Sequence, residues 1–244
     1  MDRRWVAHEV AQLSTELRAL GTEKRASGEK KYLKSDLDFY GAGVPAVRAV
    51  AKRWKKDHPG ATRDEILSLS GALWETRVHE LRTVGIALLD LYVDRLQAGD
   101  MAFVEDLINK ANTWAHVDWI AVRVAGALAT RYAGAKRVLT RWSKDTNFWV
   151  RRSAMLALLN PLRTGEGDFD LFARFASDMI EEKEFFIRKA IGWILRETAK
   201  KRPELTYAFL SDHVAEVAGL TLREGAKYLP PARRNDLMKR YKSR

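Results

Sequence analysis

Apolar residues recur every three or four positions along most of the chain, which is the spacing of one face of an α-helix. The first such stripe lies near the N-terminus and stops at Gly21, a residue type that commonly follows a helix end. Its members are Val6, Val10, Leu13, Leu17 and Leu20. A second stripe with this spacing comprises Leu81, Val84, Leu88, Leu91 and Tyr92. The pattern predicts amphipathic helices in both segments.

Start and stop signals support the same interpretation. Val44-Pro45 puts proline in the first turn of a helix that we expect to run to about His58, just before Pro59-Gly60. Thr62 and Glu65 have the spacing of a capping box at the next helix start. No stretch shows sustained strand alternation or an Asn-Gly hairpin signal. The sequence therefore predicts an all-α fold.

The chain also contains an internal repeat. The segment Phe148-Trp149-Val150-Arg151-Arg152-Ser153-Ala154 resembles Phe185-Phe186-Ile187-Arg188-Lys189-Ala190-Ile191, which begins 37 positions later, and Trp114 precedes Trp149 by 35. Repeats of this length are typical of the helix pairs of HEAT and armadillo proteins. We expect a right-handed superhelical solenoid of HEAT-like repeats with a concave groove, forming a single domain over residues 1–244. The Arg- and Lys-rich stretch from Pro230 to Arg244 is either a final helix or a frayed basic tail.

Charge makes a polyanion the expected partner. Lys and Arg number 43 against 32 Asp and Glu, a formal net charge of +11 among 244 residues. Nucleic acid, an anionic membrane surface and an acidic protein are all compatible with that charge. The absence of cysteine excludes disulfides, thiolate metal sites and a cysteine nucleophile, and it fits a cytoplasmic location. No apolar run reaches the ~20 residues of a membrane span, and the basic N-terminus has no apolar signal-peptide core.

Basic residues recur at equivalent repeat positions. Arg151-Arg152 and Arg188-Lys189 each follow the aromatic start of a repeat helix, so stacking would align them along one face. Such a stripe is able to track phosphates, with added attraction from the helix N-termini. The alternative is that each arginine pairs with a neighbouring glutamate. We favour the ligand face because two adjacent cations recur at the repeat interval.

The tryptophans divide into two groups. Trp54, Trp74 and Trp142 are expected in the core, as is usual for this residue type. Trp114 differs, because Asp118 follows at i+4 and a helix would place the indole and the carboxylate on one face. A carboxylate beside a large aromatic side chain is a candidate for chemistry rather than for packing.

Other chemistries find little support in the residues. The five histidines have no metal-ligand spacing, and His116 would lie on a different helix face from Trp114 and Asp118. Gly41-Ala42-Gly43 lacks the lysine and the preceding strand of a phosphate loop, so we interpret it as a turn between helices. We accordingly expect neither a metal nor a cofactor.

The same residues resemble the AlkD-like alkylpurine DNA glycosylases, a family of HEAT-like repeat enzymes. The match is strongest from Asn112 to Lys200, and its most specific part is Lys183-Glu184-Phe185-Phe186-Ile187-Arg188-Lys189-Ala190-Ile191-Gly192-Trp193. Trp114 and Asp118 match the family's aromatic and carboxylate pair, and Trp149-Val150-Arg151-Arg152 matches the segment that supplies a cleft arginine. Lys31-Tyr32-Leu33-Lys34 and Phe39-Tyr40-Gly41 resemble its first helical pair.

The resemblance implies roles for these positions. Asp118 would lie beside the anomeric carbon, and Trp114 and Trp193 would contact the deoxyribose and backbone around the damaged nucleotide. Arg152 would complete the cleft near a phosphate or beside Asp118, and Tyr32 would close it from the N-terminal side. The full set of expected DNA-binding residues is Tyr32, Arg48, Arg151, Arg152, Arg188, Lys189 and Arg196.

The expected reaction is hydrolysis of the N-glycosidic bond of cationic N3- or N7-alkylated purines in duplex DNA, without base flipping. The alkylated base leaves as a neutral molecule, so one carboxylate is able to suffice where glycosidases use two. The protein would act as a monomer on double-stranded DNA. Two rival functions stay open: a non-catalytic binder of branched or distorted DNA, and a protein–protein scaffold. A carboxylate facing phosphates weakens DNA binding, so Asp118 favours the enzyme over the binder.

Overall fold

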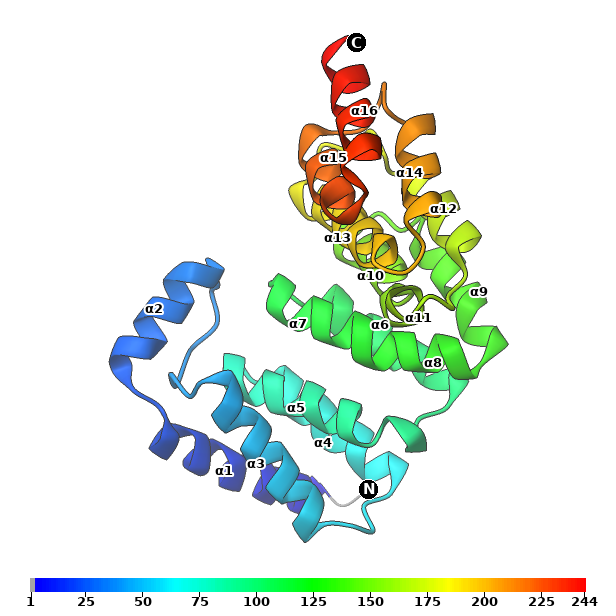
Figure 1. The fold of residues 1–244 in the computed structure, drawn as a ribbon. Coiled ribbons are helices and arrows are strands. Elements are labelled where there is room, and N and C mark those ends of the chain that lie inside the picture. The colour runs from blue at the N-terminus through cyan, green and yellow to red at the C-terminus, as the bar shows by residue number, and fades with distance from the viewer. Residues whose placement is uncertain (1–2) are drawn as a thin grey trace. The chain divides into compact units, whose positions relative to one another are not determined.

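The computed structural model describes residues 3–244, and their regular structure is helical (Figure 1). Within those residues there is no strand, and the only strand-like feature is one isolated parallel bridge between Asp38 and Val78. The prediction of an all-α fold is confirmed. The chain divides into two compact units, one ending at Ile120 and the other beginning at Ala121, and each is described separately.

Four helices of the first unit contact the same helix, α5. In chain order its helices are α1 (Arg3–Leu20), α2 (Glu23–Leu33), α3 (Val44–Asp57), α4 (Arg63–Glu75), α5 (His79–Leu91), α6 (Met101–Asn109) and α7 (Trp114–Trp119), with 3₁₀ turns at Val93–Arg95 and Ala98–Asp100. Helices α1, α3, α4 and α7 contact α5, and most residues of α5 are buried. Helix α2 differs, because none of its residues is buried.

The predicted helix ends of this unit are confirmed. Helix α1 stops at Leu20, directly before Gly21, and α3 begins at Val44 with Pro45 in its first turn. Thr62 caps α4 in a complete capping box: its hydroxyl accepts from the Glu65 N–H, and the Glu65 carboxylate accepts from the Thr62 N–H at 2.7 Å. These local signals fix where each helix starts, and packing on α5 fixes which face is buried.

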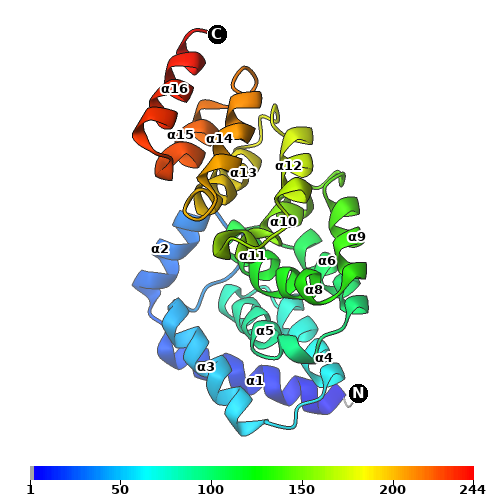
Figure 2. The same cartoon turned by 45° about the vertical axis from the view of Figure 1, so that its right-hand side comes forward.

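The second unit is built around α13. It comprises all but the first residue of a π-helical turn (Ile120–Ala125), followed by α8 (Gly126–Arg131), α9 (Ala133–Trp142), α10 (Phe148–Leu156), α11 (Leu159–Thr164), α12 (Phe169–Asp178), α13 (Phe185–Ala199), α14 (Pro203–Asp212), α15 (Gly219–Gly225), a 3₁₀ turn (Ala226–Tyr228) and α16 (Pro231–Lys242). Helices α10, α11, α14 and α15 all contact α13. Of the two alternatives for the C-terminal stretch, the structure has the final helix, α16, which Figure 2 shows in red.

The internal repeat corresponds to real structural units. Phe148 begins α10 and Phe185 begins α13, so the two similar segments start equivalent helices. Trp54, Trp74 and Trp142 are 5%, 1% and 0% exposed, which confirms their assignment to the core. No helix within residues 3–244 is long and apolar enough to cross a membrane.

The Gly41-Ala42-Gly43 segment is the predicted turn between helices, and a buried carboxylate holds it. Gly41 has a φ of +79°, a conformation that favours glycine. Glu80, 1% exposed on α5, accepts hydrogen bonds from the N–H groups of Tyr40 (3.0 Å), Gly41 (2.6 Å) and Ala42 (3.2 Å). One side chain therefore satisfies three consecutive backbone donors that no helix or strand would satisfy.

We expect Gly41→Ala to lower the free energy of unfolding by at least about 2 kcal/mol. The left-handed backbone disfavours a Cβ, and the added carbon would lie 2.1 Å from the backbone oxygen of Thr22. Chemical denaturation measures the loss. Gly28→Ala is the matched control: Gly28 lies inside α2 with nothing within 4 Å of an added Cβ, so we expect a gain of roughly 0.5–1 kcal/mol. Equal stabilities for the two variants would contradict this account of the turn.

Candidate functional site

The candidate catalytic residues of the first unit lie on one short helix. Trp114 begins α7 and Asp118 follows one turn later, so both side chains leave the same face. The Thr113 hydroxyl accepts from the Ala115 N–H at 3.3 Å and caps this helix. Both Trp114 and Asp118 are half-buried. The structure therefore presents an indole and a carboxylate together at a surface that solvent reaches.

Tyr32 lies against Trp114. The two rings meet edge to face with their centroids 6.0 Å apart and their planes at 86°. Tyr32 comes from α2 and is 72% exposed, so most of its ring is available to a ligand. Arg48 lies elsewhere on this unit: its guanidinium carbon is 4.7 Å from the ring centre of Trp119, and the Trp119 Nε1–H donates to Asp90 at 3.0 Å.

The inner face of α7 is fixed by two stacked histidines. The ring of His116 lies 4.4 Å from that of His79. The Thr83 hydroxyl donates to the backbone oxygen of His79 at 2.8 Å, so its oxygen accepts from His116 Nε2 at 3.1 Å. His116 is 1% exposed. His116 thus orients α7 from the core, and the structure gives it no access to a ligand.

Burial keeps this histidine pair neutral. Desolvation, assisted by the nearby charge of Arg82, lowers the pKa of His79 to about 4. Desolvation also lowers the pKa of His116 well below its usual value, with a further contribution from His79. In the unfolded chain both rings take up a proton near pH 6.5, whereas the folded protein keeps them neutral. The pair therefore stabilises the fold above pH 6.5 and loses that contribution as the pH falls toward 4.

We expect this loss to be measurable in a His79→Phe variant. Phenylalanine retains a ring between Phe39 and His116 but does not titrate. The free energy of unfolding of the unmodified protein should fall further between pH 7 and pH 4 than that of the variant, by on the order of 3 kcal/mol. Denaturant titrations at both pH values give this difference. Parallel pH profiles would show that His79 titrates alike in the folded and unfolded states.

A small cavity lies beside Trp114. Its volume is about 160 Å³, and Tyr32, Val44, His79 and Trp114 contribute to its mainly apolar wall. The Glu80 carboxylate also reaches this wall, but its oxygens are occupied by the turn that it holds. Pockets for drug-sized ligands typically measure roughly 300–1,000 Å³. The space beside Trp114 is therefore small for a whole nucleotide.

The predicted basic stripe of the second unit is largely used in internal contacts. Arg151 donates to both Glu182 oxygens, at 3.0 and 2.7 Å, and to the backbone oxygen of Asp145 at 2.7 Å. Arg152 is 4% exposed and donates to the backbone oxygen of Phe186. Arg188 donates to the backbone oxygen of Glu182 at 2.7 Å. Arg151 therefore has the glutamate partner of the structural alternative, whereas Arg152 and Arg188 have backbone carbonyl partners.

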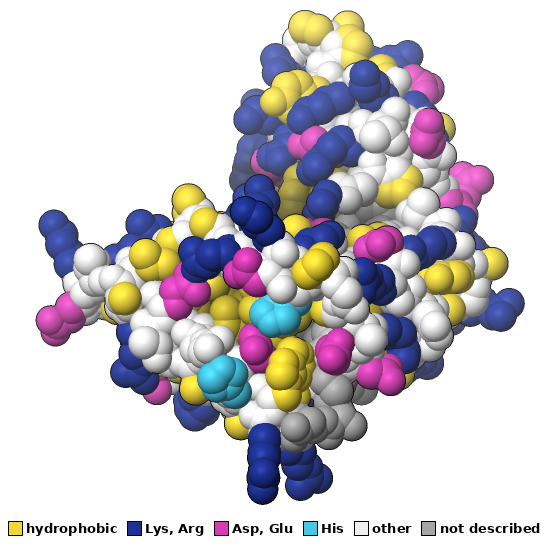
Figure 3. Space-filling model, turned by 90° about the horizontal axis from the view of Figure 1, so that it is seen from below, with side chains coloured by type: hydrophobic (Ala, Val, Ile, Leu, Met, Phe, Trp, Pro, Cys, Tyr) yellow, Lys and Arg dark blue, Asp and Glu magenta, His cyan; other side chains and the backbone are white. Residues whose placement is uncertain are grey.

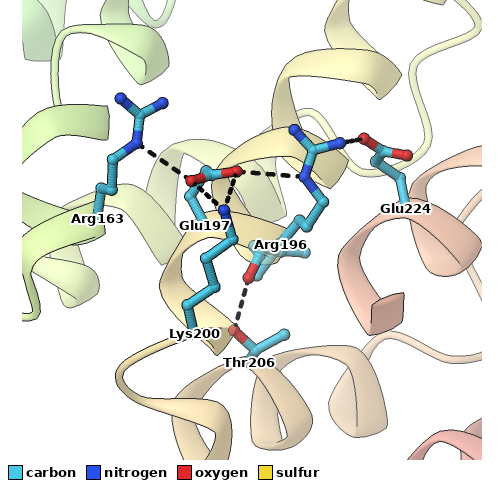
Figure 4. A network of polar contacts seen from close by, with 7 residues as sticks. Arg163, Arg196, Glu197, Lys200, Thr206 and Glu224 are labelled. Carbon is cyan, nitrogen blue, oxygen red and sulfur yellow. Dashed lines mark hydrogen bonds and ion pairs between the residues drawn. The ribbon is translucent and has the colours of Figure 1, made fainter. Parts of the chain in front are cut away.

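Arg196 belongs to an ion-pair network on α13 (Figure 4). Its guanidinium forms ion pairs with Glu197, at 3.3 Å, and with Glu224. The Glu197 carboxylate also forms ion pairs with Arg163 at 3.1 Å and with Lys200 at 2.8 Å. Burial raises the pKa of Glu197, but Lys200, Arg163 and Arg196 together outweigh it, so the pKa lies below its ordinary value. The guanidinium of Arg196 is therefore already paired with two carboxylates of the protein itself.

Two other predicted residues lie on α13. Trp193 and Lys189 are both half-buried on this helix, in the same unit as Arg152. Figure 3 shows dark blue Lys and Arg side chains over much of the face that it draws, with magenta Asp and Glu side chains between them. No group of three His, Asp or Glu side chains able to hold a metal ion occurs in the described residues 3–244.

Comparison with solved structures places this fold among known proteins. A structure described as a predicted DNA alkylation repair enzyme from Enterococcus faecalis is 25% identical, with a TM-score of 0.78, over 86% of this chain and 97% of that one. The structure of AlkD2 from Streptococcus mutans is 18% identical, with a TM-score of 0.66, over 92% and 99%. The structure of smu.31 from the same species is 19% identical, with a TM-score of 0.57, over 75% and 100%.

Sequence comparison supplies the family. No curated protein matches this chain. The family model for DNA alkylation repair enzymes matches residues 13–229, which include α7, α10 and α13 with their candidate residues. The match covers most of the chain. The all-helical fold of the chain is also that of the solved structures named above. The chain therefore belongs to the DNA alkylation repair enzyme family.

Proposed function

We propose that this protein is a DNA glycosylase that hydrolyses the N-glycosidic bond of N3- and N7-alkylated purines in duplex DNA. The observation that carries the proposal is the placement of Trp114 and Asp118 on one face of α7, with Tyr32 against the indole. Family membership supports a role in alkylation repair. Residues 1–244 would serve as one glycosylase domain, acting as a monomer.

The chemistry needs one carboxylate and one water. The alkylated purine carries a positive charge, so when the C1′–N bond breaks the base takes the bonding electrons and leaves neutral. The deoxyribose becomes an oxocarbenium ion, which the Asp118 carboxylate stabilises electrostatically. Asp118 also orients a water for attack at C1′ and accepts its proton. The products are the free base and an abasic site.

The aromatic side chains favour cationic lesions over neutral ones. A tryptophan face attracts a desolvated cation by roughly 1–2 kcal/mol. Trp114 would supply that attraction beside Asp118, and Trp193 is the further aromatic residue that we assign to the substrate. The preference would extend to the positively charged sugar of the transition state and would favour cationic lesions over neutral ones such as uracil.

We also propose that the base stays in the helical stack. Base-flipping enzymes hold the extruded nucleotide in a snug pocket. The cavity beside Trp114 is only about 160 Å³ and mainly apolar, which supports a grip on the sugar and backbone instead. Tyr32, exposed on α2, and Arg48, exposed on α3, are the predicted contacts of the first unit best placed to meet a ligand.

Duplex DNA with a single N7-methylguanine tests the proposal. Incubation with the protein followed by alkaline cleavage should show abasic sites, and a matched duplex with uracil should stay intact. If neither N7-methylguanine nor N3-methyladenine is released although the protein binds the duplex, the glycosylase assignment is wrong and a binder of branched or distorted DNA becomes the better interpretation.

A further inference from the structure

The C-terminal helix α16 has an inner face that is fixed to α14, with which it is in contact. Leu237 is 0% exposed at that contact. The Tyr207 hydroxyl donates to Asp236 at 2.9 Å, and the guanidinium of Arg233 lies 5.3 Å from the Tyr207 ring centre. Arg240 donates to the backbone oxygen of Ser211 at 2.8 Å. Two arginines of this helix therefore have structural roles.

Arg244, just beyond α16, has a similar role. Its guanidinium donates to the backbone oxygens of Val214, Ala215 and Val217, at 3.2, 2.7 and 3.1 Å. These carbonyls follow α14 and have lost their helical partners, so the arginine closes the end of that segment. The C-terminus is thus a docked element of the second unit rather than a loose tail.

The outer face of α16 carries cations of another kind. Arg234, Lys239 and Lys242 are exposed, and within the described part of the chain none of their three side chains has a hydrogen-bond or ion-pair partner. At 3.6 residues per turn they fall within an arc of about 140°. Asp236, the only acidic residue of the helix, points instead to Tyr207 on the inner side. The outer face therefore presents three uncompensated positive charges.

We infer that this outer face binds the phosphate backbone of duplex DNA. The inference rests on the proposed DNA substrate and adds a contact surface outside the candidate catalytic residues. A membrane surface fits less well, because interfacial helices need large apolar side chains on their buried face. The one fully buried apolar residue of α16, Leu237, is already covered within the protein. The outer positions of the helix are Lys, Arg, Asn, Ala and Pro, with Met238 as a single half-buried apolar residue among them.

Salt dependence of binding to undamaged duplex DNA tests the inference. Each lysine or arginine that neutralises a phosphate contributes about 0.9 to the slope of log K against log salt. The triple variant Arg234→Gln, Lys239→Gln, Lys242→Gln should therefore lower that slope by about 2 to 3 and weaken binding at least about tenfold near 0.1 M salt. Because the DNA is undamaged, this measurement does not depend on base release. Base release is tested separately, with the unmodified protein and alkylated DNA.

A charge-matched control distinguishes the effect of this particular surface from the effect of lowering the net charge of the protein. Arg137, Lys144 and Arg174 are also exposed cations of the second unit, and changing all three to glutamine removes the same charge. The control should change the slope by less than about 1. Equal losses for both triple variants would overturn the inference. An unchanged DNA slope with lost binding to phosphatidylserine vesicles would overturn it in favour of a membrane surface.

Discussion

Asp118→Asn is expected to lower the single-turnover rate of N7-methylguanine release by at least about tenfold. Asparagine has nearly the same shape, so it should fit the half-buried position on α7 without disturbing Trp114. It lacks the negative charge that stabilises the oxocarbenium ion, and it is a poor acceptor for the proton of the attacking water. Quenched single-turnover assays with excess protein measure the chemical step.

Binding measurements separate the loss of chemistry from a loss of folding or affinity. Removing a negative charge beside phosphates should leave DNA affinity unchanged or make it tighter. Asp212→Asn, at an exposed aspartate that ends α14, is the control and should retain the full rate. If Asp118→Asn releases the base as fast as the unmodified protein, the glycosylase assignment survives but the carboxylate mechanism is wrong.

Glu80→Ala is expected to lower the free energy of unfolding by about 3–5 kcal/mol. The Glu80 carboxylate accepts from three consecutive backbone N–H groups, and alanine would leave all three without a protein partner. Burial raises the pKa of Glu80 and the three hydrogen bonds lower it, with a net upward shift. The hydrogen bonds of the turn thus offset only part of the cost of burying this carboxylate.

Urea denaturation followed by tryptophan fluorescence gives the effect as a shift of the midpoint. Glu181→Ala provides the control, since Glu181 is exposed and the change should stay within about 0.5 kcal/mol. Because the turn leads into α3 and lies beside the cavity at Trp114, Glu80→Ala should also weaken the placement of Tyr32. A destabilisation below about 1 kcal/mol would mean that water replaces the carboxylate at the three donors.

Local sequence signals predicted the helices well. Pro45 and the Thr62–Glu65 capping box act within one helical turn, so their effect can be predicted without knowledge of the rest of the chain. The repeat predicted that Phe148 and Phe185 start equivalent helices, and residue type alone put Trp74 and Trp142 in the core. Each of these inferences depends on short-range physics.

Long-range pairing was not predictable in the same way. Arg151 finds Glu182 31 residues later, and Glu80 reaches back 39 residues to Gly41. Nothing in the spacing of Arg151 and Glu182 distinguishes this pair from many other acid–base combinations in a chain with 43 basic and 32 acidic residues. The partner of Glu80 is a backbone N–H group, which every residue except proline has. The repeat did offer one signal, because Glu182 precedes the Phe185 start by three positions, close to where Arg151 follows the Phe148 start.

The lack of any buried residue in α2 separates its stability from that of the remaining protein. An eleven-residue helix is below the ~12–15 residues that an isolated helix needs in water. The contacts that hold α2 are mostly at its surface, among them the Thr22 cap, the Arg25–Glu29 and Lys30–Asp38 ion pairs and the Tyr32 edge contact. Its amides should therefore exchange with solvent through local opening, far more often than the core unfolds. Every such opening moves Tyr32 away and exposes the edge of Trp114. The protein therefore populates a state with an uncovered Trp114 indole even without a ligand.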